Sequence, residues 1–232
     1  MDNELTKLLV VVAKKPVPGK VKTRLHPELS PIDAAGLYWC FILDRIKEIV
    51  TIDNIDMAIA YTPEEAGEIF DAFALDGFEL FAQKGNSLGE RLHNIFLEKF
   101  ELGYNAVSII DSDSPDLPKS FIEASFQLLL SKQAEVVFGP CHDGGYYLIG
   151  MCKPNSELFR NIPWSTGNVL STSLEKARKM GLNVSLLPRW NDLDTFEDLL
   201  EFYNKYKTCR LPKDWAGKET FTFLSRLEKI NT

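Results

Sequence analysis

Short runs of apolar residues alternate along the chain with stretches whose apolar positions recur every three or four residues. The run from Leu8 to Ala13 is apolar throughout, which is typical of a strand buried on both faces. Residues 31 to 50 follow with helical spacing, and Ser30 and Pro31 suit the N-cap and the first turn of that helix. The pattern therefore predicts repeated strand-helix units.

The remaining elements are predicted from the same two patterns, short apolar runs for strands and helical spacing for helices. Further strands are expected at 55–61, 78–82, 106–110, 135–138, 146–150 and 184–187, and further helices at 63–74, 88–101, 118–131, 169–180 and 195–206. This alternation predicts an α/β fold with a mainly parallel, mixed central sheet and helices on both faces. We expect one domain over residues 1–232, in which 207–232 forms a C-terminal extension with a last short helix.

Composition narrows the class of protein. Hydrophobic residues make up 45% and charged residues 25%, as in soluble globular proteins. The net charge of -7 argues against general nucleic-acid binding, because no broad basic excess can neutralise phosphates. Scattered cysteines indicate neither a zinc site nor a disulfide framework. The acidic N-terminus and the lack of an apolar run of bilayer length predict a cytoplasmic protein without signal peptide or membrane span. The oligomeric state stays open.

The strand at 106–110 runs directly into acidic residues, Asp111, Asp113 and Asp116. Open α/β sheets place their ligands at the carboxyl ends of strands. Paired carboxylates repel each other unless a cation lies between them, and oxygen ligands suit Mg²⁺ or Mn²⁺, which often bridges to substrate phosphates. The alternative is a turn whose side chains cap backbone groups, with Asp116 capping the next helix. Asp113 is the strongest candidate metal ligand.

A basic loop follows the first strand, with five Lys or Arg residues in the eleven positions from Lys14 to Arg24. The glycine that a Walker A loop requires before Lys22-Thr23 is missing. Backbone N–H groups near Gly19 and the basic side chains can still surround a polyphosphate. The alternative is a solvated basic loop.

Three further segments carry groups that suit a ligand. Paired glycines after Asp143 let the backbone approach a ligand or form an ordinary hairpin turn. Gln83 can read a base edge and Gly85 allows close approach, although the segment is equally explained as a loop before a helix that begins at Ser87 with Glu90 as its capping-box partner. Trp164 and Thr166 offer an aromatic ring and a hydroxyl, useful against a sugar or acceptor, although a tryptophan can equally fill the edge of the core.

Asp194 opens the helix expected near residue 195. With Glu197 three residues later, it fits an N-cap with capping-box spacing. A carboxylate here can also complete the metal coordination begun by Asp113. The two roles do not exclude each other.

Five motifs in this order resemble the nucleotide-diphospho-sugar transferase (GT-A-like) superfamily, and within it a bacterial group of uncharacterised or arsenosugar-associated glycosyltransferases. They are K-x-P-x-x-G-x-x-K-T-R-L (14–25), G-x-D-x-P-D-L (111–117), G-P-x-x-D-G-G-Y-Y-L-I-G (139–150), W-x-T (164–166) and D-x-D-T-x-E-D-L (192–199). The family usually has glycine at the position of Asp111, where a carboxylate either adds a metal ligand or crowds the ribose.

The resemblance implies a three-layer sandwich and assigns roles to these positions. The nucleotide would be held by Lys14, Gly19, Lys22, Thr23, Arg24, Gln83 and Gly85, and Mg²⁺ or Mn²⁺ by Asp111, Asp113 and Asp194. The sugar or acceptor would face Asp143, Gly144, Gly145, Trp164 and Thr166, and the catalytic residues would be Asp113, Asp143 and Lys22.

Two reactions fit such a scaffold, because a fold alone does not fix chemistry. One is sugar transfer from a nucleotide-diphospho-sugar to a small-molecule acceptor. The other is nucleotidyl transfer from a nucleoside triphosphate with pyrophosphate release, as in guanylyltransferases that act on phospholactate or the molybdenum cofactor, which usually have a glycine-richer first loop. A third interpretation is a nucleotide-binding regulator without turnover. The paired carboxylates argue against it, because binding alone rarely needs them.

Overall fold

The structure of the protein is a computed structural model that describes residues 5–74, 76–212 and 215–231. The chain divides into two compact units. The first unit comprises Met1–Ala13, Asp53–Asp111 and Ser120–Trp190, and the second comprises Lys14–Ile52, Ser112–Lys119 and Asn191–Thr232. The expectation of a single domain over 1–232 stays a prediction.

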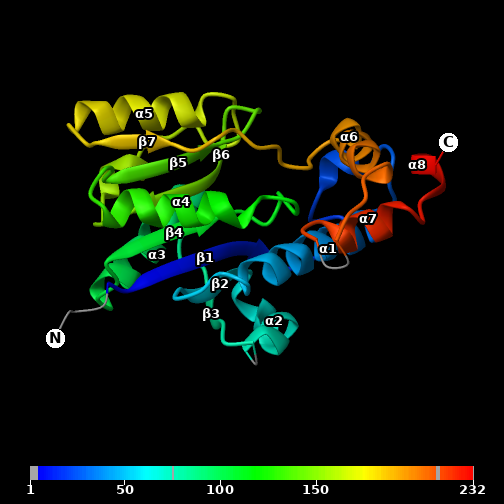
Figure 1. The fold of residues 1–232 in the computed structure, drawn as a ribbon, viewed down its shortest axis with the longest axis horizontal. Coiled ribbons are helices and arrows are strands. Elements are labelled where there is room, and N and C mark those ends of the chain that lie inside the picture. Colours follow the sequence, from blue (N-terminus) through cyan, green and yellow to red (C-terminus); the bar gives the residue numbers. More distant parts are fainter. Residues whose placement is uncertain (1–4, 75, 213–214, 232) are drawn as a thin grey trace. The chain divides into compact units, whose positions relative to one another are not determined.

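The first unit is built on a mixed sheet of seven strands (Figure 1). These are β1 (Lys7–Lys14), β2 (Asp56–Thr62), β3 (Glu79–Ala82), β4 (Ala106–Ile110), β5 (Val136–Pro140), β6 (Tyr146–Met151) and β7 (Val184–Leu186); the last residue of β1, Lys14, belongs to the second unit. Their order is β3-β2-β1-β4-β6-β5-β7. β1 pairs in parallel with β4, β2 with β3, and β5 with β7, whereas β6 runs antiparallel to β4 and β5. The predicted mixed α/β sheet is confirmed.

Helices cover both faces of this sheet. In the first unit they are α2 (Gly67–Ala74), α3 (Leu88–Glu101), α5 (Val169–Lys179) and, apart from its first residue, α4 (Lys119–Leu130). Leu8 on β1 shares one core cluster with Phe96 of α3 and Ala177 of α5. On the opposite face, Ser108 of β4 hydrogen-bonds Ser125 of α4 at 2.9 Å, and Figure 1 shows α4 in front of the sheet. Alternating side chains along a strand thus serve two helical layers.

The second unit contains α1 (Pro31–Ile49), α6 (Phe196–Lys207), α7 (Lys218–Leu224) and α8 (Glu228–Asn231). α1 begins as predicted, because the Ser30 side chain accepts the N–H of Asp33 and proline occupies the first turn. In the described part of the expected extension 207–232, α7 and α8 are two short helices where one was predicted. The second unit also contains the short 3₁₀ helix η1 (Thr23–Leu25), and the first unit contains η2 (Glu64–Ala66) and η3 (Ser156–Phe159). η2 replaces the first turn of the helix expected at 63–74.

The N-cap assigned to Asp194 is wrong by one residue. Thr195 caps α6: its hydroxyl accepts the N–H of Asp198 at 3.2 Å, and Asp198 Oδ2 accepts the N–H of Thr195 at 2.6 Å. This reciprocal pair is a capping box built from Thr195 and Asp198, in place of Asp194 and Glu197. The shift leaves the Asp194 carboxylate available for other partners.

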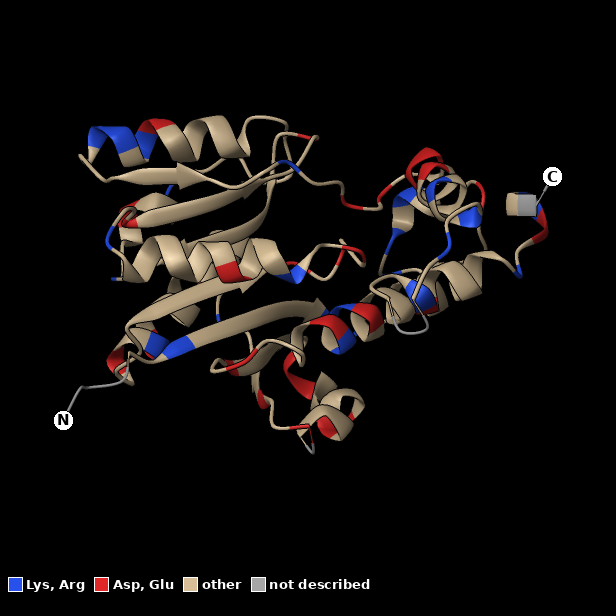
Figure 2. Cartoon of the chain, viewed as in Figure 1, with Lys and Arg blue, Asp and Glu red and all other residues tan. Residues whose placement is uncertain are grey.

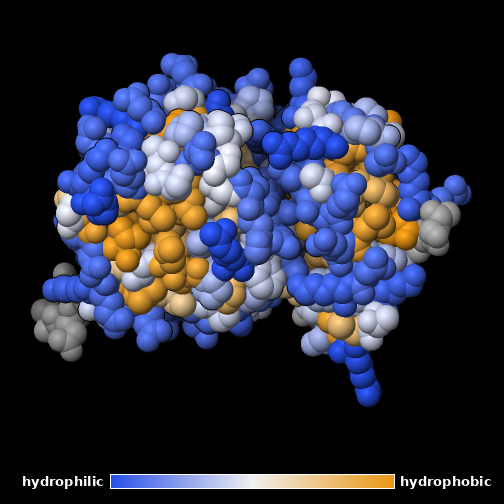
Figure 3. Space-filling view, turned by 90° about the horizontal axis from the view of Figure 1, so that it is seen from above, coloured by the Kyte–Doolittle hydropathy of each residue, from blue (hydrophilic) through white to orange (hydrophobic). Residues whose placement is uncertain are grey.

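Charged residues are concentrated outside the central sheet. In Figure 2 the strands are mostly tan, and the blue and red residues lie mainly on helices and loops. Hydrophilic residues dominate the face seen in Figure 3, with apolar areas between them. Among the described residues, no helix combines the length and the apolar character that crossing a bilayer requires.

Candidate functional site

The basic loop after β1 turns the side chain of Lys22 inward. Gly19 has φ +80°, which suits a residue without Cβ, and the N–H of Lys20 donates to the Val17 carbonyl at 2.9 Å. Lys22 itself has φ 47° and ψ 43°, a left-handed conformation that is uncommon for a residue with a side chain, directly before η1. Its side chain is only 4% exposed, so this conformation places a cation in the interior of the second unit.

The Lys22 ammonium contacts two of the predicted site carboxylates. Nζ lies 2.7 Å from Asp113 Oδ1 and 2.8 Å from Asp194 Oδ1, and it donates to the Leu193 carbonyl at 2.8 Å. These three acceptors match the three N–H donors of an ammonium group. Burial alone would lower the pKa of Lys22, but the charges of Asp113 and Asp194 outweigh it and the pKa is raised. Lys22 is therefore a cation at neutral pH.

Asp113 and Asp194 come from separate segments that the backbone joins. The N–H of Leu193 donates to the Asp113 carbonyl at 3.0 Å. The two carboxylate side chains remain 38% and 32% exposed, respectively, so solvent reaches them although it does not reach the ammonium. Arg24 adds a contact of 3.2 Å from its guanidinium to Asp194 Oδ2.

The electrostatics of Asp194 reflect this basic surrounding. Burial would raise the pKa of the Asp194 carboxyl, whereas Lys22, Arg24 and Lys14 lower it, and the net shift is downward. The residue is therefore ionised at neutral pH. Lys14, Lys22 and Arg24 all act on this carboxylate, so the basic loop and Asp194 are electrostatically coupled.

Two residues of α1 support the cluster. The Tyr38 hydroxyl accepts the N–H of Lys14 at 3.0 Å and shares a hydrogen bond of 2.7 Å with the Ser112 hydroxyl. The ring of Phe41 lies 5.1 Å from Lys22 Nζ. Neither residue stands out in the sequence, because a tyrosine and a phenylalanine on the apolar face of a helix look like ordinary core residues.

The loop that carries Asp113 is anchored from two sides. Arg45 is fully buried and donates to the carbonyls of Pro115 at 3.0 Å and Leu117 at 2.8 Å. Asp116 accepts hydrogen bonds from Lys205 at 3.0 Å and the Tyr206 hydroxyl at 2.7 Å, both on α6. The Asp116 carboxylate therefore holds α6. Its capping of the following helix stays a prediction.

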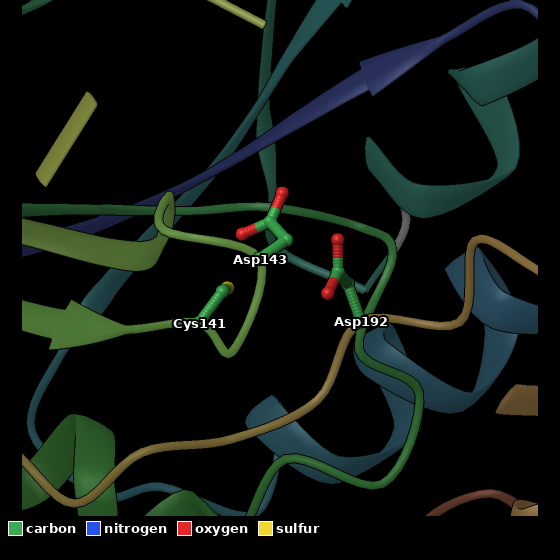
Figure 4. A group of neighbouring side chains, drawn as sticks. All are labelled: Cys141, Asp143 and Asp192. Atoms are coloured by element: carbon green, nitrogen blue, oxygen red, sulfur yellow. The ribbon is translucent and has the colours of Figure 1, made fainter. Parts of the chain in front are cut away.

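Other predicted site residues lie in the first unit. Asp111 follows β4, and its N–H donates to the Tyr147 carbonyl at 3.0 Å. Asp143 is exposed on the loop between β5 and β6, where Figure 4 shows it with Cys141. Asp143 Oδ1 accepts the N–H of Gly145 at 2.7 Å, the local hydrogen bond of an Asx turn. This hydrogen bond therefore stabilises the turn from within.

Packing explains the paired glycine of that loop. Gly144 has φ +90°, and a Cβ there would lie 2.1 Å from the Gly167 carbonyl oxygen. The N–H of Leu170 also donates to the Gly144 carbonyl at 2.9 Å. The glycine therefore allows two backbone segments to touch, and it fixes the loop of Asp143 against the start of α5.

Gln83 and Gly85 shape the connection from β3 to α3. The Gln83 amide donates to the Ala60 carbonyl at 2.7 Å. Gly85 has φ +134°, and a Cβ there would lie 2.8 Å from the Glu90 Cβ, so only glycine lets the loop pass this close to α3. The Arg91 side chain donates to the Gly85 carbonyl at 3.0 Å.

Trp164 lines a pocket in the first unit. The pocket has a volume of about 590 Å³ and combines aromatic and apolar side chains with polar ones; its lining residues are Ser87, Gly89, Glu90, His93, Ser156, Phe159, Arg160, Asn161, Ile162 and Trp164. The Trp164 ring meets Tyr146 edge to face at 6.3 Å, and Thr166 binds the Pro163 carbonyl at 2.7 Å. His93 and Arg160 had no distinguishing signal in the sequence.

The structure thus sorts the predicted residues into two sets. The second unit contains Lys14, Gly19, Lys22, Thr23, Arg24, Asp113 and Asp194. The first unit contains Gln83, Gly85, Asp111, Asp143, Gly144, Gly145, Trp164 and Thr166. In the second unit, Lys22, Arg24, Asp113 and Asp194 contact one another and form a cluster of charges.

Comparisons with known proteins agree with this fold. A crystal structure from Desulfovibrio desulfuricans, described as a "putative nucleotide-diphospho-sugar transferase", is 32% identical and superposes with a TM-score of 0.85 over 97% of this chain and 96% of that one. The protein thus has the nucleotide-diphospho-sugar transferase fold. The model of the family described as "Uncharacterized protein conserved in bacteria (DUF2064)" matches residues 45–166, and the chain belongs to this family. The comparison with curated proteins gave no match.

More distant structures share the fold alone. A cytidylyltransferase from Leptospira borgpetersenii has a TM-score of 0.55 at 14% identity, over 97% of this chain and 96% of that one. Glucosyl-3-phosphoglycerate synthase from Mycobacterium tuberculosis, in complex with Mn²⁺, UDP and glucosyl-3-phosphoglycerate, has a TM-score of 0.54 at 13% identity, over 90% of this chain and 82% of that one. Nucleotidyl and glycosyl transferases therefore both occur on this scaffold.

Proposed function

We propose that the protein is a metal-dependent transferase, which moves a sugar from a nucleotide-diphospho-sugar donor to a small-molecule acceptor. The observation that carries the proposal is the contact of Lys22 with both Asp113 and Asp194. A departing nucleoside diphosphate gathers negative charge on its phosphates, and fixed positive groups and a cation held by carboxylates stabilise that charge. The second unit contains fixed positive groups, Lys22 and Arg24, and the carboxylates of Asp113 and Asp194.

The basic loop is the proposed phosphate site. Lys22 and Arg24 carry fixed charge beside Asp194, and Lys14 acts on the same carboxylate. Exposed Gly19 and Thr23 add a backbone and a hydroxyl donor on the same loop. Guanidinium and ammonium groups bind phosphate oxygens strongly because both partners are charged.

The proposed cation site fits Mg²⁺ or Mn²⁺. Asp113 and Asp194 offer hard carboxylate oxygens, and both already converge on one cation, the Lys22 ammonium. We assign these two as ligands, with Asp111 as a third. A divalent ion bound there would supply positive charge opposite the phosphates of the leaving group. The Mn²⁺ and UDP in the distant mycobacterial synthase support the choice of ion.

Sugar and acceptor recognition is assigned to the first unit. The pocket beside Trp164 combines an aromatic wall with polar side chains, a combination that suits a hydroxylated ring. We assign Thr166 and the loop of Asp143, Gly144 and Gly145 to the same role, with Asp143 as a catalytic carboxylate. Gln83 and Gly85 are assigned to the base. We place the reaction in the cytoplasm.

Nucleotidyl transfer is the second candidate function. It is favoured by the gathering of Lys14, Lys22 and Arg24 around one carboxylate, because a triphosphate carries more negative charge than a diphosphate sugar. The fold shared with a cytidylyltransferase is compatible with it.

One experiment separates the two reactions. The full chain is incubated with Mg²⁺ or Mn²⁺ and a panel of nucleotide sugars plus mixed acceptors, and separately with nucleoside triphosphates plus sugar phosphates. Release of nucleoside diphosphate from a nucleotide sugar supports glycosyl transfer, and pyrophosphate supports nucleotidyl transfer. If the protein binds nucleotide but releases neither product from any donor, the proposal is refuted and the interpretation as a nucleotide-binding regulator remains.

Asp113→Asn provides the matched variant for this assay. We expect turnover to fall by about a hundredfold or more, since one carboxylate beside the transferred group is lost. Asp53→Asn removes the same charge from an exposed position and should leave turnover unchanged. Circular dichroism checks that both variants are folded. Equal rates in Asp113→Asn and the wild type would remove Asp113 from the site.

A further inference from the structure

Lys22 sits in the kind of cage that a metal ion takes. Its Nζ is surrounded by oxygens of Asp113, Asp194 and the Leu193 carbonyl at 2.7 to 2.8 Å. Two carboxylates and one backbone carbonyl form a donor set that hard divalent cations also use. The ammonium is enclosed, whereas the carboxylates stay about one-third exposed on the side that solvent reaches.

Charge decides what such a cage can hold. Asp113 and Asp194 contribute two negative charges, which Lys22 and Arg24 balance. A divalent ion added to this balanced set would be repelled by two fixed positive charges and would have to share carboxylate oxygens that already accept from Lys22. The protein should therefore bind the ion weakly by itself.

We propose that the Lys22 ammonium and a divalent cation compete for the carboxylates of Asp113 and Asp194, so that Lys22 makes tight metal binding conditional on phosphate. The inference rests on the proposed function, since it deepens the role of the same cluster. Phosphate oxygens give the exposed Arg24 a new partner and add negative charge beside the buried Lys22, and both effects favour the ion at the carboxylates. Metal and nucleotide then strengthen each other's binding, because coupling between two ligands is reciprocal.

The test measures Mn²⁺ binding to the full chain without nucleotide, by calorimetry and by electron paramagnetic resonance of the free ion. Lys22→Met should bind Mn²⁺ about tenfold more tightly than the wild type, since the competitor is gone. Lys20→Met, which removes the same charge from an exposed position of the same loop, should change the affinity little. Adding Asp113→Asn to Lys22→Met should abolish the gain, which places the ion at Asp113.

Lys22→Gln covers the case in which Lys22→Met does not fold, because its amide still donates to the carboxylates without carrying charge. Equal Mn²⁺ affinity in the wild type and in the folded Lys22 variant would overturn the proposal, as would an equal gain in Lys20→Met. The outcome is separable from that of the proposed function. A gain in affinity without turnover of any donor leaves the competition standing, and turnover without the gain refutes only the competition.

Discussion

Asp194 has a different partner from the one that its position before a helix suggests. Thr195 and Asp198 form the capping box of α6, and the Asp194 carboxylate binds Lys22 and Arg24. Because the pKa of Asp194 is lowered in the folded protein, its carboxylate stabilises the fold above the ordinary pKa of 3.8, and this stabilisation is lost as the pH falls through the folded pKa. The residue therefore links charge pairing to acid stability.

Asp194→Asn tests this linkage. The variant should unfold more easily by about 1 to 2 kcal/mol at neutral pH, as expected for losing hydrogen bonds between charged groups. The difference should shrink as the pH falls below 3.8 and through the lowered pKa of Asp194, because the wild-type carboxylate then becomes protonated as well. Thermal unfolding followed by circular dichroism at a series of pH values measures it. A difference that stays constant over this range would contradict a stabilising ion cluster.

Sequence reasoning identified the residue types of the cluster but not their pairing. Lys22, Asp113 and Asp194 stood out because basic and acidic residues follow strand-like runs. No local pattern could show that Lys22 would lie between the two carboxylates, since this depends on contacts between segments about 90 and 170 positions away. The partners of Asp116 on α6 were not foreseen for the same reason, since they lie far along the chain.

At the scale of elements, α1 organises the second unit. Asp44 on α1 is 1% exposed, and its carboxylate accepts the N–H groups of Glu219 and Thr220, both at 2.8 Å. These N–H groups belong to the first turn of α7, where backbone N–H groups find no acceptor within the helix itself. A carboxylate from one helix thus caps another, which also suits the dipole of α7.

Asp44→Ala should therefore destabilise the protein by about 2 to 3 kcal/mol, because one buried and one partly buried N–H donor lose a charged acceptor. Asp44→Asn keeps one carbonyl oxygen and should lose less. Lys47→Met is the matched control: Lys47 on the same helix pairs with Glu219 at 2.7 Å, but its side chain is 61% exposed, and such surface pairs contribute little. Urea unfolding compares the three variants. A loss in Lys47→Met equal to that in Asp44→Ala would contradict the capping role.

The element boundaries were the most predictable part of the fold. α3 occupies the expected residues 88–101, and β4 the expected 106–110, because periodicity and caps are local signals. The antiparallel course of β6 next to β4 was not foreseen, since strand order depends on long-range pairing. The cap that Asp44 provides for α7 was missed as well, because nothing in an apolar helix face indicates a partner 175 residues away.

At the scale of the whole molecule, the second unit is assembled from three segments distant in sequence. Lys14–Ile52, Ser112–Lys119 and Asn191–Thr232 contribute to it. Lys22 contacts the second and third of these segments, and Asp44 contacts the third. Each segment therefore satisfies charged groups on another, and none holds all of its partners by itself.

A chain that ends at Trp190 tests this interdependence. It keeps every strand of the sheet and the helices of the first unit, but it lacks the partners of Lys22, Asp44 and Asp116 that lie beyond residue 190. Buried charges without partners are costly, so residues 14–52 and 112–119 should lose their structure. Hydrogen exchange should show protection retained in β4 and α3 and lost in α1. Full protection of α1 in the shortened chain would mean that the first two segments fold without the third, and uniform loss would mean that the sheet depends on it too.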